Sequence, residues 1–215
     1  MASRRGQFIV VEGCDRSGKS TQCERLVQRL QEENHKVQLL KFPDRTTQTG
    51  KMIDNYLKQS SHMNDQAIHL LFSANRWEAV DTMASLLRSG TTLIVDRYAY
   101  SGVAFSSAKA RIRFFGLDLG WCKQPDVGLL RPDLILFLDL PIAEAEKRGG
   151  FGDERYEKKE LQIKVREQFM KLKDDQWKVI NAAQSTDEVH QAIWQTIQPF
   201  IHQSDPKALR YDLWK

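Results

Sequence analysis

The 215-residue sequence has few of the residues that build metal centres or disulfide frameworks. Its three cysteines include no C-x-x-C pair, which fits a reducing compartment and gives no cysteine-based metal site. The five histidines are scattered without an H-x-x-x-H pair, so we expect them to be structural or surface residues. No apolar run reaches transmembrane length, and the N-terminal apolar stretch is too short for a secretory signal. We therefore expect an intracellular, cytoplasmic protein without a membrane partner, with nuclear and mitochondrial pools left open.

Charge of one sign is not concentrated in any part of the chain. The 32 Lys and Arg residues and the 28 Asp and Glu residues give a formal net charge of +4. No basic block is dense enough to indicate a nucleic-acid partner. The mild basicity suits a site for phosphorylated small molecules, and an ordinary solvated surface explains it equally well. The hydrophobic content of 41% and the length indicate one globular domain over residues 1–215.

A phosphate-binding loop pattern, G-x-x-x-x-G-K-[ST], lies at Gly13–Ser20. The apolar run Phe8–Val11 predicts a buried strand before it, and apolar residues at helical spacing predict a helix after it. Lys19 can reach the outer phosphates of a nucleotide, and the Ser20 hydroxyl can bind Mg²⁺. The alternative is a glycine-rich turn that binds nothing, which the correct flanking elements disfavour.

Predicted strands alternate with predicted helices along the chain. Short apolar runs predict strands over residues 8–11, 37–42, 92–95, 134–138 and 177–180. Helical periodicity predicts helices over residues 18–33, 49–59, 64–88, 99–109, 117–123, 141–150, 153–174 and 186–201. We expect a bend near Asp81, a cap at Asn64 or Asp65, and a cap at Thr186 or Asp187. This order predicts an α/β fold with a five-stranded parallel sheet covered by helices on both faces.

Polar clusters follow three of the predicted strands, at Gly13–Ser20, Pro43–Arg45 and Asp96–Tyr98. Ligands of parallel α/β sheets bind at the carboxyl ends of the strands, so we expect these clusters to converge. A GTPase is disfavoured because the chain has no N-K-x-D, and its only D-x-x-G lies inside the phosphate loop. A motor or a helicase would usually need a longer chain.

A small nucleotide kinase needs arginines for a second phosphate, a carboxylate near Mg²⁺ and a lid. Arg45 and Arg97 lie at strand ends, and Asp96 follows the third strand. Phe72 and Arg76 are four residues apart on one helix face, where they could stack on a base and bond its edge. A core phenylalanine beside a surface arginine is the alternative. The glycines among charged residues in 147–156 suggest a lid, with an ordinary exposed loop as the alternative.

Five segments, in order, resemble thymidylate kinases: Glu12–Thr21, Phe42–Arg45, Phe72–Glu78, Asp96–Tyr98 and Arg148–Glu157. The resemblance covers residues 6 to about 195 and is closest to the eukaryotic enzymes, which carry a basic residue in the phosphate loop. It implies a three-layer P-loop nucleoside monophosphate kinase fold with a mobile lid at about 147–160. It also implies a homodimer that transfers a phosphoryl group from MgATP to dTMP, giving dTDP for dTTP biosynthesis.

The resemblance implies how the acceptor dTMP is bound. Asp15 would contact the 3′-hydroxyl, Phe72 would stack on thymine and Arg76 would bond the edge of the base. Phe105 would crowd the 2′ position and disfavour ribonucleotides. Arg45 and Arg97 would hold the acceptor phosphate, and Tyr156 and Gln162 would close over the nucleotide. The acceptor site would also include Phe42 and Ser101.

The donor side is implied in the same way. Arg16 would stabilise the charge of the transferring group as an internal arginine finger, and Arg148 would lie against adenine. Ser20 and Asp96 would hold Mg²⁺, Asp96 through water or the acceptor phosphate. The ATP phosphates would be held by Arg16, Ser17, Gly18, Lys19, Ser20 and Thr21. The residues that we expect to be catalytic are Asp15, Arg16, Lys19 and Arg97.

The chain departs from the family at Ala110–Gly120, which is longer than the corresponding segment and which we interpret as a surface loop. Gln184 stands where related enzymes can place a basic residue near adenine. Two rival functions stay open: a kinase for another nucleoside monophosphate or nucleoside, and a nucleotide-binding regulatory protein without turnover. Acceptor specificity discriminates between the kinases. A structural or nucleic-acid-binding module has no support beyond mild basicity.

Overall fold

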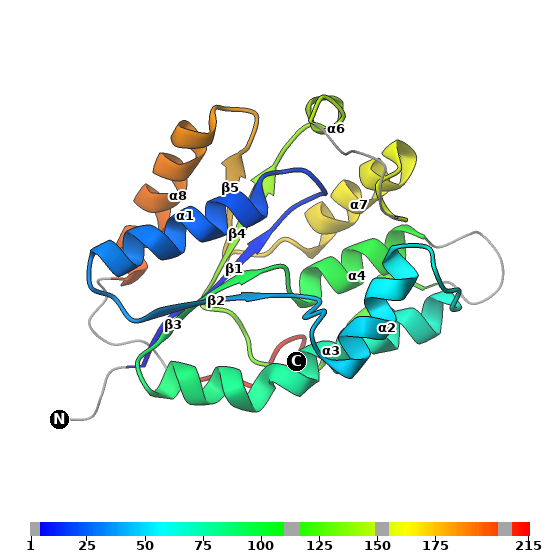
Figure 1. The fold of residues 1–215 in the computed structure, drawn as a ribbon, viewed down its shortest axis with the longest axis horizontal. Helices are drawn as coiled ribbons and strands as arrows, with labels where there is room; N and C mark the ends of the chain where they lie inside the picture. The colour runs from blue at the N-terminus through cyan, green and yellow to red at the C-terminus, as the bar shows by residue number, and fades with distance from the viewer. Residues whose placement is uncertain (1–4, 110–116, 149–154, 202–207) are drawn as a thin grey trace.

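Five parallel strands form one sheet in the order β2-β3-β1-β4-β5 (Figure 1). This computed structural model describes residues 5–109, 117–148, 155–201 and 208–215. Every pairing is parallel, and Val10 at the centre of the sheet lies opposite Val95 on one side and Ile135 on the other. The strands are β1 (Phe8–Glu12), β2 (Val37–Lys41), β3 (Thr92–Asp96), β4 (Leu134–Asp139) and β5 (Trp177–Asn181). The predicted five-stranded parallel sheet is confirmed.

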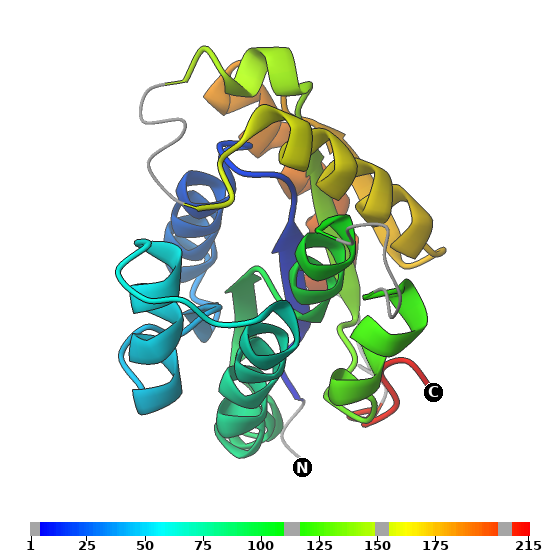
Figure 2. The same ribbon diagram turned by 90° about the vertical axis from the view of Figure 1, so that its right-hand side faces the viewer.

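Helices cover both faces of the sheet. Figure 1 shows α1 and α8 together on one side, and α3 and α4 on the other. The turned view of Figure 2 shows α2 beside α3, against which it packs. The helices are α1 (Lys19–Glu32), α2 (Gln48–Leu57), α3 (Asp65–Arg88), α4 (Ala99–Ala108), α5 (Leu119–Lys123), α6 (Ile142–Ala145), α7 (Lys159–Leu172) and α8 (Thr186–Ile201), with a short 3₁₀ helix, η1 (Gln124–Asp126).

The core consists of two apolar clusters, one on each face of the sheet. Successive side chains of a strand point to opposite faces, so Ile9 of β1 belongs to the cluster under α1 and α8. Its neighbour Val10 belongs to the cluster under α3, α4 and α7. Because both faces are covered, β1 and β3 are buried along their whole length, and their inner residues, Ile9–Val11 and Leu93–Val95, are all apolar.

We also considered a break near Asp81, but helix α3 runs without interruption through this residue, so a break there is wrong. The helix contains neither proline nor glycine, and its buried stripe continues past Asp81 through Met83 and Leu87. Its start is as predicted, because Asn64 Oδ1 accepts a hydrogen bond from the amide of Ala67 at 2.7 Å.

Two helix ends and the capping residue of α8 differ from the predictions. Helix α6 ends at Ala145 instead of near residue 150, and α7 begins at Lys159 instead of Asp153. The predicted lid at about 147–160 lies partly outside the described residues, which omit 149–154. Helix α8 is capped by Ser185, whose hydroxyl and amide both pair with the Glu188 carboxylate as in a capping box. No helix in the described part of the chain has the length and apolarity that crossing a bilayer requires.

Candidate active site

The phosphate loop lies between the end of β1 and the start of α1, and two of its glycines are required by geometry. Gly13 has φ of 152°, and a Cβ atom there would lie 2.7 Å from the carbonyl oxygen of Leu138. Gly18, with φ of 91°, precedes the first residue of α1. Any other residue would be strained in these backbone conformations. The loop therefore needs glycine at both positions in order to connect β1 to the start of α1. Backbone N–H groups at that terminus attract anions.

Arg16 and Arg97 also have left-handed backbone conformations, with φ of 62° and 69°. Positive φ is uncommon for residues other than glycine and is concentrated at functional sites. Arg16 lies in the phosphate loop, and Arg97 directly follows β3. Both strained positions therefore coincide with arginines for which we predicted phosphate contacts.

Lys19, the first residue of α1, is almost fully buried under the phosphate loop. Its ammonium group donates to the carbonyl oxygen of Cys14 at 2.6 Å and lies 3.3 Å from Ser17 Oγ. Burial, together with the charge of Arg97, lowers the pKa of Lys19 to about 8. A bound phosphate group would restore the charged form.

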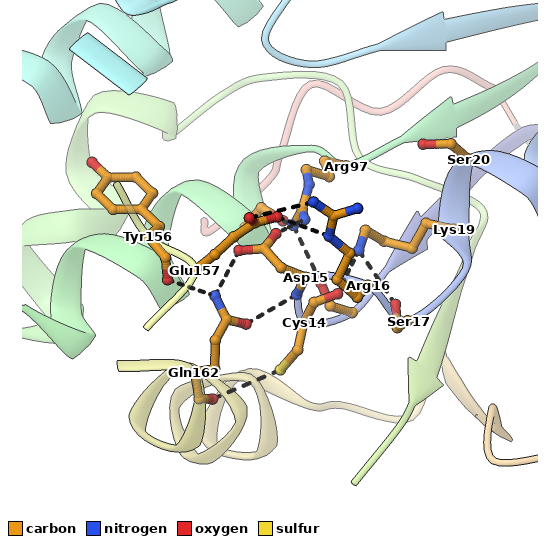
Figure 3. A network of polar contacts seen from close by, with 12 residues as sticks. Cys14, Asp15, Arg16, Ser17, Lys19, Ser20, Arg97, Tyr156, Glu157 and Gln162 are labelled. Atoms are coloured by element: carbon orange, nitrogen blue, oxygen red, sulfur yellow. Dashed lines mark hydrogen bonds and ion pairs between the residues drawn. The ribbon is translucent and has the colours of Figure 1, made fainter. Parts of the chain in front are cut away.

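Asp15 and Arg97 form an ion pair that joins the phosphate loop to the end of β3 (Figure 3). Gln162 of α7 lies behind Asp15, accepts from its amide at 2.9 Å and donates to its Oδ2 at 2.6 Å. We expected Gln162 to close over the nucleotide. The structure instead buries its side chain completely, where it holds Asp15 and also donates to the Tyr156 carbonyl oxygen.

Glu12, the last residue of β1, anchors the start of α4 from beneath the site. Its carboxylate accepts from the amides of Tyr98 and Ser101 at 2.9 and 3.0 Å, and from Ser101 Oγ at 2.5 Å. Burial raises the pKa of Glu12, although the hydrogen bond from Ser101 and the charge of Arg97 oppose the shift. Ser101 Oγ also accepts from Arg97 at 3.1 Å, so this network positions both residues.

Ser20 and Asp96 meet where β3 ends beside α1. Ser20 Oγ donates to Asp96 Oδ2 at 2.5 Å, and Lys41 Nζ lies 3.1 Å from Ser20 Oγ. Asp96 Oδ1 is buried and has no hydrogen-bond partner among the described residues. One hydroxyl and one carboxylate suit Mg²⁺, which usually keeps several waters and takes further ligands from substrate phosphates. The residues present therefore fit this ion.

The guanidinium of Arg16 lies beside the carboxylate of Glu157, with 3.0 Å between Nε and Oε1 (Figure 3). Arg148 bridges two loops, because it donates to the carbonyl oxygens of Arg16 at 2.7 Å and Ala182 at 3.1 Å. It therefore lies next to the loop that contains Gln184, at the end of β5. The second arginine predicted for the donor side is thus attached directly to the phosphate loop.

Phe72 and Arg76 lie on the same face of α3, as predicted, and both line the cavity of the site. Arg76 is nevertheless almost fully buried, at 2% exposure, and forms a two-point ion pair with Asp126. Arg45 pairs with Asp54 of α2 at 2.7 Å.

Tyr156 closes the cavity beside Phe105, with 5.7 Å between the ring centroids. The phenol oxygen of Tyr156 accepts a hydrogen bond from Lys109 Nζ at 2.5 Å. Lys109 also donates to Tyr56 at 3.0 Å, so that α2, α4 and the residues before α7 are held together. Burial raises the pKa of Tyr156.

These groups surround one cavity of about 690 Å³, a size typical of small-molecule sites. Its walls include seven Lys or Arg residues and three Asp or Glu residues among those described, so it favours anions. Of the predicted site residues, Ser17 and Gln162 are not part of the wall. The wall contains Asp15, Arg16, Gly18, Lys19, Ser20, Thr21, Phe42, Arg45, Phe72, Arg76, Asp96, Arg97, Ser101, Phe105, Arg148 and Tyr156.

Sequence reasoning missed several polar residues of the site, chiefly Glu12, Lys41, Asp126 and Glu157. Glu12 and Lys41 are the last residues of β1 and β2, so the rule that strand ends form the site would have found them. Glu157 lies in the predicted lid segment, where we assigned nucleotide contacts only to Arg148 and Tyr156. No local sequence pattern marks Asp126 as a site residue, because its role depends on contact with α3.

The sequence was compared with those of known proteins. A sequence model of the thymidylate kinases matches residues 11–193. The chain belongs to the thymidylate kinase family. It is 49% identical to a thymidylate kinase of Homo sapiens over the full length of both chains. It is also 53% identical to a thymidylate kinase of Arabidopsis thaliana, over 90% of this chain and 71% of the relative.

Thymidylate kinase architecture is also evident from a solved structure. The fold is similar to that of the thymidylate kinase of Candida albicans, with a TM-score of 0.88 and 39% sequence identity. The similarity covers 98% of this chain and 99% of the other. The family and the fold class predicted from the sequence are therefore both confirmed.

Proposed function

We propose that this thymidylate kinase transfers the terminal phosphoryl group of MgATP to dTMP, giving dTDP and ADP. An oxygen of the acceptor phosphate attacks the γ-phosphorus, while the bond from that phosphorus to the ADP oxygen breaks. One observation carries the proposal. A phosphate loop and an aromatic–arginine pair, Phe72 and Arg76, line the same cavity, so two nucleotides can meet there.

The acceptor would lie with its base between Phe72 and Arg76, and with its phosphate near Arg45 and Arg97. Phe72 is only partly buried, so its ring is available for stacking. Arg97 is fixed by Asp15 and Ser101, and such fixed charges position a phosphate without reorganisation during the reaction. Phe105 lies beside Arg97, at 5.3 Å from its guanidinium carbon to the ring centroid, where it would border the sugar.

The donor would lie on the phosphate loop, with its outer phosphates near Lys19 and Arg16. Phosphoryl transfer needs little covalent chemistry from the protein, so positioning and charge stabilisation carry the catalysis. Ser20 and Asp96 would hold Mg²⁺, which neutralises charge on the phosphates when bound. Arg16 would leave Glu157 to stabilise the transferring group.

We also propose a single kinase domain with a lid at about 147–160, and a homodimer. Leu70 and Trp77 support the dimer, because these large apolar side chains are 49% and 42% exposed and lie seven residues apart on one face of α3. The buried free thiols of Cys14, Cys23 and Cys122 support a cytoplasmic location.

The decisive experiment measures ADP release from MgATP with dTMP, dUMP, UMP, CMP, AMP, GMP and thymidine offered separately. We expect the strongest turnover with dTMP and poor turnover with ribonucleotides. Strong turnover with another acceptor would keep the kinase and overturn the base and sugar contacts. No turnover from folded protein that binds ATP would favour the regulatory alternative.

A further inference from the structure

A buried ion pair lies behind the wall of the acceptor cavity. Asp126 is completely buried, and its carboxylate accepts from Arg76 Nε at 3.1 Å and from Nη2 at 2.7 Å. This side-by-side geometry fixes the plane of the guanidinium as well as its position. Arg76 therefore cannot rotate freely within the cavity wall.

Helix α3 holds the segment that carries Asp126. Ser73 Oγ lies 2.7 Å from Asp126 Oδ1 and 2.9 Å from the carbonyl oxygen of Pro125. One turn further along the helix, Trp77 Nε1 donates to the same carbonyl oxygen at 2.7 Å. The carboxylate is thus positioned by the helix that also carries Phe72 and Arg76.

The two terminal nitrogens of the guanidinium also lie next to Gly102 of α4. A Cβ atom added at Gly102 would lie 2.9 Å from Arg76 Nη2 and 3.0 Å from Nη1. Glycine at this position therefore leaves the space that the guanidinium occupies. Nε and Nη2 are bonded to Asp126, so within the described chain Nη1 is the guanidinium nitrogen without a hydrogen-bond partner.

We propose that Asp126 is a positioning residue that sets the base specificity of the acceptor site through Arg76. A guanidinium has donors only, so the free Nη1 requires a hydrogen-bond acceptor on the edge of the base. A base with an amino group at that edge would leave two donors facing each other, and sites of this kind discriminate strongly. The proposal rests on the proposed function, because it assumes that the base lies against Phe72 and Arg76.

The alternative is that Asp126 only neutralises a buried charge. Loss of a purely structural pair would lower stability and affect both substrates alike. Loss of a positioning residue would instead affect the acceptor and spare the nucleotide on the phosphate loop. Comparison of the KM values for dTMP and MgATP therefore separates the two roles.

Two variants test the proposal, one at Asp126 and one at Gly102, which both lie next to Arg76. Asp126→Asn weakens the ion pair and keeps the side-chain size. Gly102→Ala leaves Asp126 in place and displaces the guanidinium, and alanine has the higher helix propensity, so this variant should fold even if the first does not. The control is Asp133→Asn, which weakens a similar two-point pair with Arg5 away from the cavity.

Kinetics are measured with dTMP, with dCMP, which carries an amino group in place of a thymine carbonyl, and with MgATP. We expect both variants to raise the KM for dTMP by about tenfold and to reduce the preference for dTMP over dCMP. The KM for MgATP should stay within about twofold of that of the unmodified protein. The control should leave both KM values unchanged.

A rise below about fivefold in Gly102→Ala, or a parallel rise in both KM values, overturns the proposal. If Asp126→Asn does not fold, Gly102→Ala decides alone. If the unmodified protein does not phosphorylate dTMP, the proposed function itself fails. If the unmodified protein phosphorylates dTMP and the variants leave its kinetics unchanged, only the role of Asp126 fails.

Discussion

Arg16 of the phosphate loop and Glu157, two residues before α7, form an ion pair with 3.0 Å between Nε and Oε1. The arginine that we expect to stabilise the transferring phosphoryl group therefore faces a carboxylate in this structure. Glu157 itself is largely buried, at 9% exposure. The negative charge of bound ATP would compete with Glu157 for Arg16, so nucleotide binding and the position of the segment before α7 should be coupled.

Replacing Arg16 by alanine should remove most of the turnover and leave acceptor binding intact. Arginine fingers accelerate phosphoryl transfer by about 10³–10⁵, so we expect kcat to fall about a thousandfold or more. The measurements are steady-state ADP release and calorimetric binding of dTMP. Arg25→Ala, on α1 and paired with Asp187 of α8, is the control, and an unchanged kcat for Arg16→Ala would remove Arg16 from the mechanism.

Phe72→Ala should weaken binding of the acceptor. Stacking of a base on an aromatic side chain contributes about 1–3 kcal/mol, so the KM for dTMP should rise by roughly tenfold. The KM for MgATP should stay near that of the unmodified enzyme. Thr82→Ala, exposed on the same helix, is the control, and an unaffected KM for dTMP would show that the base lies elsewhere.

ATP affinity should decrease above about pH 8. The buried Lys19 has a pKa of about 8 in the free protein, against an ordinary value of 10.5, so it loses its charge in this range. Between about pH 8 and pH 10.5 the unfolded chain binds more protons at Lys19 than the folded chain does. The contribution of Lys19 to the stability of the free protein therefore increases with pH over this range. Bound phosphate favours the charged form, so ATP binding above pH 8 must take up a proton.

Calorimetric titration of ATP at pH 8.5, in two buffers with different ionisation enthalpies, measures this proton uptake. Lys51→Met, which removes an exposed lysine of α2, should leave the uptake unchanged. Equal binding enthalpies in the two buffers after correction for dilution would show that Lys19 keeps its proton.

Asp96→Asn should raise the Mg²⁺ concentration needed for half-maximal activity. Asp96 Oδ2 is bonded to Ser20, whereas Oδ1 is buried without a partner among the described residues, so this second oxygen is available to orient the ion or its waters. Substitutions around metal sites reduce metal affinity by about 10–100-fold, and we expect a similar shift. Magnesium titrations of ADP release measure it, with Asp187→Asn on α8 as the control. A shift that also appears in the control would speak against the assignment.

Leu70→Glu should convert a dimer to a monomer. The substitution places a charge on the apolar face of α3 that we propose as the dimer contact, where burial of an unpaired charge is costly. Sedimentation velocity of the unmodified chain and the variant at equal concentration measures the change. A monomeric unmodified chain, or a variant that stays dimeric, would contradict the proposed interface.

Much of this fold could be predicted because its signals are local. The phosphate loop is contiguous from Gly13 to Ser20, and the buried strands are recognisable as short apolar runs. Helix ends were less predictable. Neither proline nor glycine interrupts α3 at Asp81, and a capping box at Ser185 decides the start of α8.

The sequence by itself determined the α/β order, the phosphate loop and the family motifs, because each depends on residues that are close together in the chain. Only the tertiary structure decided which charged groups are partners. Gln162 reaches Asp15, and Asp126 reaches Arg76, across many intervening residues. Such contacts arise because β1 is inserted between β3 and β4, which brings distant segments to one edge of the sheet. Contacts between residues so far apart in the sequence depend on the order of the strands and on the packing of the helices. The hydrophobic periodicity of the sequence predicts neither of these.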